Sequence, residues 1–116
     1  ITDPLPVQKA YEYGARDITI IRTYEKSFIR KTKMENHIAA FFTKQYPNIS
    51  RALKINAATY NAALNFINNP PADCKITQIC PPQRLTVKRA TTNINIMKKD
   101  YKIGLACGTQ YLQKKI

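Results

Sequence analysis

Residues 38–67, IAAFFTKQYPNISRALKINAATYNAALNFI, decide the fold that the sequence predicts, because their apolar side chains recur at helical spacing. The apolar positions are Ile38, Phe42, Ile49, Leu53, Tyr60, Leu64 and Ile67. At about 100° per residue, Ile67 lies within roughly 20° of Ile38 around a helix axis, so the stripe stays in phase through Pro47. We therefore predict one long amphipathic helix over residues 33–68, kinked at Pro47, where the proline ring removes a backbone hydrogen bond.

Both ends of this helix carry sequence signals. Thr32, Lys33, Met34 and Glu35 read as a capping box: the Glu35 amide can donate to the Thr32 hydroxyl, and the Thr32 amide can donate to the Glu35 carboxylate. The run Asn-Asn-Pro-Pro at residues 68–71 stops the helix, because proline cannot continue it.

A second long helix is predicted over residues 7–31. Its apolar stripe consists of Val7, Tyr11, Gly14, Ile18, Ile21 and Phe28. Gly14 weakens this helix locally by about 1 kcal/mol relative to alanine, and its missing side chain allows a close helix contact. Two long antiparallel amphipathic helices would thus dominate a single helical domain of residues 1–116.

Shorter elements are expected in the remainder, residues 83–116, after a loop over residues 69–82 that holds four prolines and two cysteines. Residues 83–101 allow two interpretations: their β-branched content slightly favours strands, whereas their apolar residues also recur at helical spacing. The residues at helical spacing are Val87, Ala90, Ile94, Met97 and Tyr101. Gly104 and Gly108 are expected to break any regular element that follows.

Charge bounds the kind of partner. The 116 residues include 19 Lys and Arg against 7 Asp and Glu, a formal net charge of +12, and 44% of them are hydrophobic, which is enough for a packed core. A chain this basic is attracted to anionic polymers or surfaces. No apolar run approaches the roughly 20 residues needed to span a bilayer. With 3 glycines in the whole chain, we expect no Gly-rich phosphate loop.

If residues 7–31 are helical, a basic track runs along one face. Its members are Arg22, Lys26, Arg30 and Lys33, at spacings of four, four and three residues. On a helix they fall within roughly 80° of one another. The track is either a solvated helix face or a docking surface for an acidic partner. A second basic cluster favours docking if it faces the same way, and it contains Lys88, Arg89, Lys98, Lys99 and Lys102.

Residues 55–72 carry no side chain that is charged at neutral pH. The apolar members of this neutral face are Ile55, Tyr60, Leu64, Phe66 and Ile67. One interpretation is a helix half-buried against the rest of a bundle. The alternative is a surface that meets another subunit or a lipid headgroup layer, because a neutral face is desolvated cheaply.

The cysteines and the single histidine leave further alternatives. Cys74 and Cys80 are a candidate disulfide with Cys107 as a free thiol, or all three thiols are free. One histidine without a CxxC motif predicts no zinc site, and we expect no metal or cofactor. His37 could serve as the base of a nuclease, but no second acid or base signature accompanies it, so we expect no enzyme. Nucleic acid is disfavoured as a partner, because no helix-turn-helix, zinc-finger or RNP-type motif is present.

Several short segments match one known family. They are Lys9-Ala10-Tyr11-Glu12, Ile20-Ile21, Tyr24-Glu25-Lys26 and Ile29-Arg30, followed by Ala40-Phe41-Phe42, Tyr46, Arg84-Leu85 and Ile94. These segments resemble the aromatic, basic helices of the abalone sperm lysin family. Because the chain contains no tryptophan, it is more similar to the fusogenic acrosomal sperm-protein paralogue than to lysin itself.

The resemblance implies an all-α bundle of about five helices, with residues 83–101 helical. It also implies a non-enzymatic gamete-interaction protein, secreted from the sperm acrosomal vesicle, that perturbs membranes during sperm–egg fusion. The implied partner is an anionic membrane surface or an acidic egg-coat glycoprotein, with a homodimer as a further option. Two alternatives stay open: lysin-like opening of the egg vitelline envelope, and a basic RNase-type toxin of α+β fold that uses His37.

Overall fold

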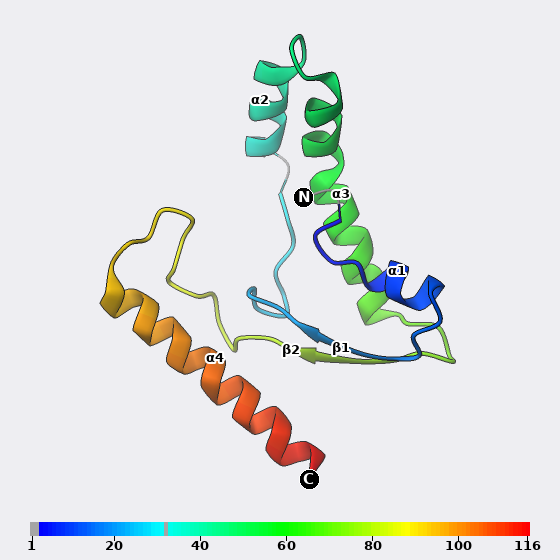
Figure 1. Cartoon of the computed structure of the whole chain (residues 1–116), viewed down its shortest axis with the longest axis vertical. Helices are drawn as coiled ribbons and strands as arrows, with labels where there is room; N and C mark the ends of the chain where they lie inside the picture. Colours follow the sequence, from blue (N-terminus) through cyan, green and yellow to red (C-terminus); the bar gives the residue numbers. More distant parts are fainter. Residues whose placement is uncertain (1–2, 32) are drawn as a thin grey trace. The chain divides into compact units, whose positions relative to one another are not determined.

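In the computed structural model, which describes residues 3–31 and 33–116, four helices and two strands are present (Figure 1). In chain order they are α1 (Val7–Glu12), β1 (Asp17–Ile21), α2 (Lys33–Phe42), α3 (Pro47–Asn68), β2 (Lys75–Ile79) and α4 (Ile94–Lys115). The protein is therefore a mixture of helix and sheet. The predicted all-α bundle of about five helices is wrong.

The chain divides into two compact units. Unit 1 comprises Ile1–Ile18 and Ile29–Ile76, and unit 2 comprises Thr19–Phe28 and Thr77–Ile116. The division falls within the two strands, so the first residues of each strand belong to unit 1 and the remaining ones to unit 2.

The predicted helix over residues 7–31 is wrong because the chain leaves the helical conformation after α1. Gly14 adopts a φ of 100°, a left-handed conformation that residues with a side chain rarely take, and it turns the chain out of α1. Residues 17–21 then read Asp-Ile-Thr-Ile-Ile, a β-branched run that suits an extended strand. The apolar spacing that suggested a helix therefore belongs to a short helix, a turn and a strand.

β1 and β2 pair in parallel as a two-stranded sheet. In unit 1 the backbone N–H of Lys75 donates to the carbonyl oxygen of Arg16 at 2.7 Å, and in unit 2 the N–H of Arg22 donates to that of Ile79 at 2.9 Å. Both strands advance in the same direction along this ladder, which defines parallel pairing. β2 occupies part of residues 69–82, so the expectation of a plain loop there is also wrong.

α2 and α3 form a helical hairpin within unit 1 (Figure 1). α2 begins at the predicted Lys33 and ends at Phe42, and α3 begins at Pro47 and ends at the predicted Asn68. The capping residue Thr32 lies outside the described residues. The predicted single helix kinked at Pro47 is wrong, because proline at the first position of a helix sacrifices no intrahelical hydrogen bond and so favours a new start.

Small residues are buried where α2 and α3 meet, whereas two members of the predicted apolar stripe are exposed there. Ala39 on α2 is fully buried, and its carbonyl oxygen accepts hydrogen bonds from the hydroxyls of Thr43 at 2.8 Å and Ser50 at 2.9 Å. Ile38 and Ile49, members of that stripe, are exposed. Their phase with Ile67 was therefore no evidence for a continuous helix.

The second half of α3 supplies most of the core of unit 1. Its buried residues recur at helical spacing and are Ala57, Tyr60, Ala63, Leu64 and Ile67. α1 packs on this segment, with the rings of Tyr11 and Phe66 at 5.6 Å between centroids and Val7 buried.

In unit 2, a loop after β2 leads to α4. The side chain of Asn93 caps this helix by accepting hydrogen bonds from the backbone N–H groups of Asn95 and Ile96. Residues 94–101 are therefore helical, and the strand interpretation fails for them. Gly104 and Gly108 lie inside α4 and do not break it, which corrects a second expectation. Among the residues that the structure describes, no helix is both long and apolar enough to cross a membrane.

Candidate functional site

The predicted basic track does not form, because it required residues 7–31 to be helical. Arg22 is buried, with 5% of its surface exposed, and its guanidinium donates to the side-chain oxygen of Gln78 at 3.1 Å. The same group donates to the backbone carbonyl oxygens of Glu25 and Lys26 at 3.3 and 3.4 Å. Arg22 therefore holds the turn after β1 against β2 within unit 2. Lys26, the other cation of this turn, is exposed.

Arg30 also has a structural role. In unit 1 its guanidinium donates to Asn56 and lies 5.3 Å from the ring centroid of Tyr60. Its backbone N–H donates to the side-chain oxygen of Asn61 at 3.0 Å, and its carbonyl oxygen accepts from the same side chain at 3.0 Å. These contacts fasten the segment that precedes α2 onto α3. The side chain of Lys33, the last member of the track, lies outside the described part of the protein.

The predicted neutral face is mainly core. Tyr60, Leu64 and Ile67 are buried, at 5%, 7% and 4% exposure, and Phe66 is half-buried against Tyr11. Ile55 is the exposed member. The structure thus favours the first interpretation of residues 55–72, in which the helix is packed rather than free to meet another surface.

The second basic cluster, by contrast, is exposed. Lys88, Arg89, Lys98, Lys99 and Lys102 all lie in unit 2, and all are exposed. The exposed cations of this unit also include Lys26, Arg84, Lys114 and Lys115. Unit 2 contains ten Lys and Arg against two Asp and Glu, a net of +8 out of +12 for the chain. Most of the net charge of the protein is therefore carried by the smaller unit.

The two acidic residues of unit 2 are withdrawn from its surface. Asp100 on α4 has 7% of its surface exposed, and its Oδ2 accepts a hydrogen bond from the backbone N–H of Val87 at 2.7 Å. Glu25 is half-buried, and its Oε2 is shielded from solvent. Fully exposed charged side chains of unit 2 are therefore all positive. The sequence showed the excess of cations but not the withdrawal of the anions.

α4 also exposes a stripe of large apolar side chains that sequence reasoning missed. Its members are Ile94, Met97, Tyr101, Leu105 and Leu112, which are between 48% and 69% exposed. The opposite side of α4 is more enclosed: Asp100 is buried, and Ile96, Ile103, Cys107 and Tyr111 are half-buried. The signal was present in the helical spacing of Ile94, Met97 and Tyr101, but the expected break at Gly104 concealed its continuation.

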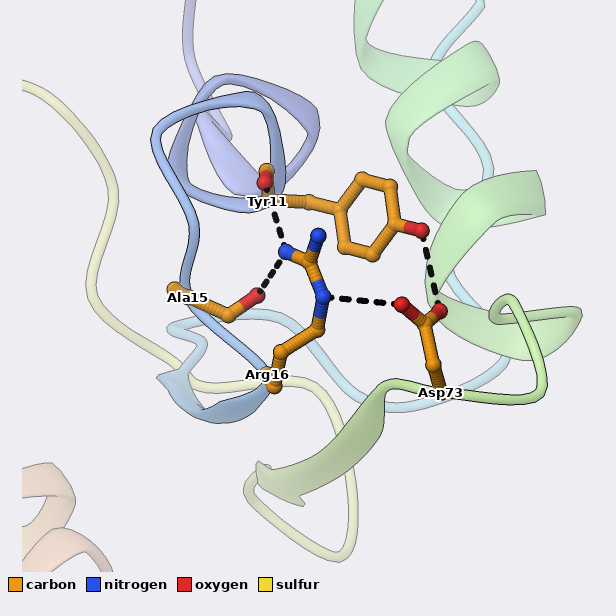
Figure 2. Close-up of polar contacts among 4 residues, drawn as sticks. All are labelled: Tyr11, Ala15, Arg16 and Asp73. Atoms are coloured by element: carbon orange, nitrogen blue, oxygen red, sulfur yellow. Dashed lines mark hydrogen bonds and ion pairs between the residues drawn. The ribbon is translucent and has the colours of Figure 1, made fainter.

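A polar cluster lies in unit 1, where Tyr11, Arg16 and Asp73 converge (Figure 2). The Tyr11 hydroxyl donates to Oδ1 of Asp73 at 2.9 Å, and Nε of Arg16 donates to Oδ2 at 2.8 Å. Nη1 of Arg16 donates to the carbonyl oxygens of Tyr11 and Ala15, and the guanidinium carbon lies 4.1 Å from the centroid of the Tyr11 ring. The cluster ties α1 and the start of β1 to the segment before β2.

The hydrogen bond between Tyr11 and Asp73 shifts both groups. It raises the pKa of the Tyr11 hydroxyl above its usual value and lowers the pKa of the Asp73 carboxyl. The positive charge and hydrogen bond of the Arg16 guanidinium lower the pKa of Asp73 further. Arg16 and Asp73 are exposed and already bonded to each other. This arrangement is that of a structural clip between chain segments, in which the polar atoms satisfy one another.

The remaining candidates from the sequence stand apart. His37 is exposed on α2. All three cysteines are free thiols, so the candidate disulfide between Cys74 and Cys80 is wrong. The two residues lie at opposite ends of the extended strand β2, which keeps them apart. Within residues 3–31 and 33–116, no group of three or more His, Cys, Asp and Glu side chains could hold a metal ion.

Fold and charge together define a small, basic, mixed α/β module. The chain belongs to the family described as a domain of unknown function, DUF6363, whose sequence pattern matches residues 46–115. It is also similar to the uncharacterized protein YjjU of Escherichia coli strain K12, with 27% identity over 118 residues that cover 97% of this chain and 32% of that protein. The chain thus spans about a third of the length of this relative. No solved structure matches it significantly.

The predicted resemblance to the abalone sperm lysin family is wrong, because the chain belongs to this other family. The segments that suggested it lie in different elements here: residues 9–12 in α1, residues 20–21 in β1 and residues 24–26 in the turn that follows. In the lysin resemblance these three segments were expected on one long helix. Short runs of aromatic and charged residues therefore matched without a shared fold.

Proposed function

We propose that the protein is a binding module that attaches to a negatively charged surface through unit 2. The observation that carries this proposal is the sorting of charge within the unit. Nine exposed Lys and Arg side chains share unit 2 with two acidic residues, one buried and one half-buried. A surface on which one sign of charge is exposed attracts a polyanion over a long range and repels other cationic surfaces.

This proposal does not depend on the overturned resemblance. The gamete, acrosomal and egg-coat expectations came from that resemblance alone and have no further support in the residues. The attraction to an anionic partner came from the charge of the chain, and the exposed cations of unit 2 support it. Because surface charges are screened with a Debye length of about 8 Å at physiological salt, the binding should weaken as salt is raised.

The test compares two variants with the same net charge. One replaces Lys88, Arg89, Lys98 and Lys99 of unit 2 with Gln. The control replaces Lys31, Lys44, Arg51 and Lys54, four exposed cations of unit 1, with Gln. Affinity for heparin, used as a generic polyanion, is measured over a range of NaCl concentrations.

The unit 2 variant should lose at least about tenfold in affinity, because each cation near an anionic surface contributes about 1 kcal/mol. The control should lose much less. Equal losses for both variants would show that net charge, and not unit 2, governs binding, and would overturn the proposal. If the protein degrades RNA and His37→Ala abolishes this activity, the nuclease alternative would replace the binding-module proposal.

A further inference from the structure

We propose that α4 is a membrane-contacting helix, and that the negatively charged surface bound by unit 2 is the headgroup layer of an anionic lipid bilayer. This inference rests on the proposed function, because it names the partner that the exposed cations meet. It adds a second kind of contact, since the exposed apolar stripe of α4 would enter the boundary between headgroups and acyl chains.

The geometry of the stripe suits a flat surface. Ile94, Met97, Tyr101, Leu105 and Leu112 follow one another at spacings of three, four, four and seven residues. At about 100° per residue they fall within an arc of about 80° around the helix. At about 1.5 Å per residue the stripe runs for about 27 Å along the axis. One straight line of apolar side chains of this length can enter a planar layer all at once.

Cations border the stripe where a headgroup layer would meet them. Lys98 and Lys102 lie about 40° and 80° from Ile94 around α4, and Lys115 lies on the other side at about 60°. Lysine side chains at such positions lay their methylene stems along the apolar layer and keep the ammonium group among the headgroups. The acid of α4, Asp100, is turned into unit 2 and does not oppose this contact.

The loop before α4 carries two further exposed cations of unit 2, Lys88 and Arg89. The hydrogen bond between Val87 and Asp100 fixes this loop to the helix, immediately beside Lys88 and Arg89. Phosphate groups of nucleic acid would satisfy these cations equally well, but they offer nothing to a line of exposed apolar side chains. A bilayer of anionic lipid presents both negative charge and apolar volume in one plane, so it is the partner that the surface fits.

The absence of tryptophan from the sequence provides a direct test. Leu105→Trp places a single reporter on the stripe, and Gln110→Trp places a matched one at an exposed position about 160° from Ile94 around α4. Leu112→Trp is a second stripe reporter in case the first disturbs the fold, and far-UV circular dichroism checks each variant. The probes are vesicles of phosphatidylcholine, with and without phosphatidylglycerol.

We expect the emission of Leu105→Trp to shift to shorter wavelength with phosphatidylglycerol vesicles, and to be quenched by brominated lipid. Gln110→Trp should show neither effect. In addition, Leu105→Gln combined with Leu112→Gln should weaken vesicle binding at least about tenfold, because apolar area no longer leaves water. The matched control, Gln110→Ala combined with Gln113→Ala, should leave it unchanged.

The outcomes separate this inference from the proposed function. If heparin binding persists but the stripe reporters do not respond to vesicles, the membrane contact is refuted and the anionic-surface proposal stands. If heparin binding is also absent, both fail. Equal shifts of the stripe and Gln110 reporters would overturn the assignment of the stripe as the contact, as would binding to RNA without binding to vesicles.

Discussion

Oδ2 of Asp100 accepts a hydrogen bond from the backbone N–H of Val87 at 2.7 Å, and this bond joins α4 to the loop that precedes it. Asp100 is 7% exposed, so the bond is shielded from water. It has two consequences for the surface of unit 2. It fixes the position of the neighbouring cations Lys88 and Arg89, and it keeps a negative charge away from the exposed side of the unit.

Asp100→Ala should therefore loosen the loop. A hydrogen bond to a charged group contributes about 1.5–3 kcal/mol, and we expect a loss of unfolding free energy of about that size. Asp100→Asn should lose less, because the amide oxygen can still accept from Val87. The local measurement is hydrogen exchange at the Val87 amide, which should accelerate in Asp100→Ala. Unchanged exchange there would contradict the assigned role of the carboxylate.

Asn61→Ala should destabilise unit 1. Its side chain both accepts from the backbone N–H of Arg30 and donates to the Arg30 carbonyl oxygen, each at 3.0 Å. Removing this side chain should cost about 1–3 kcal/mol of unfolding free energy, measured by urea denaturation. Lys54→Ala, an exposed substitution on the same helix, is the control and should stay within about 0.5 kcal/mol of the parent. Comparable losses in both would argue against a specific role for Asn61.

The clip at Asp73 should make stability depend on acidity. The bonds from Tyr11 and Arg16 lower the pKa of the Asp73 carboxyl in the folded state. Its contribution is therefore complete above the unfolded pKa of about 3.9 and is lost as pH falls through the lower folded value. Thermal unfolding followed from pH 7 downwards should show a steeper acid decline for the parent than for Asp73→Asn. Parallel curves would contradict this prediction.

The same clip predicts a loss of stability at high pH. The pKa of the Tyr11 hydroxyl is raised in the folded state, so its contribution is complete below the unfolded pKa of about 10 and is lost as pH rises through the folded value. Tyr11→Phe removes the hydroxyl and keeps the ring against Phe66. The alkaline decline of unfolding temperature should be shallower in this variant, with absorbance of tyrosinate as the companion measurement.

The cysteines should differ in reactivity. All three are free, so three thiols should titrate in denaturant without a reductant. In the native protein Cys74 is buried, whereas Cys80 and Cys107 are half-buried. Alkylation followed by peptide mass spectrometry should therefore modify Cys74 last. Early modification of Cys74, or fewer than three titrating thiols, would contradict the structure.

The sequence predicted correctly those features that depend on neighbouring residues, namely helix ends and helical periodicity. The start of α2 at Lys33, the end of α3 at Asn68 and the helical periodicity of the α3 core all follow from spacing and end signals. β1 was missed although its β-branched run was visible, because apolar residues at 18 and 21 also fit a helical stripe. Its pairing with β2 is not encoded locally, since each strand has five residues and the partner lies far away in the chain.

Lys88, Arg89, Lys98 and Lys99 of the predicted basic cluster are exposed in unit 2, and their role in binding stays a prediction. The predicted track through Arg22 and Arg30 does not form, because residues 7–31 are not one helix. Both side chains instead make hydrogen bonds within their own units. Spacing indicated an apolar stripe at Ile94, Met97 and Tyr101, but it gave neither the exposure of this stripe nor the burial of Asp100, because apolar periodicity does not say which helix face the rest of the protein covers.

The parallel pairing of β1 and β2 sets the order in which the chain can assemble. The α2–α3 hairpin is made from contiguous residues, so its contacts close short loops and form quickly. The sheet joins segments on either side of this hairpin, and bringing them together carries the larger entropy cost of a long loop. We therefore expect the hairpin to form first and to shorten the distance that the two strands must bridge. Parallel pairing then completes folding as the slow, late step, which a chain that ends before residue 75 cannot take.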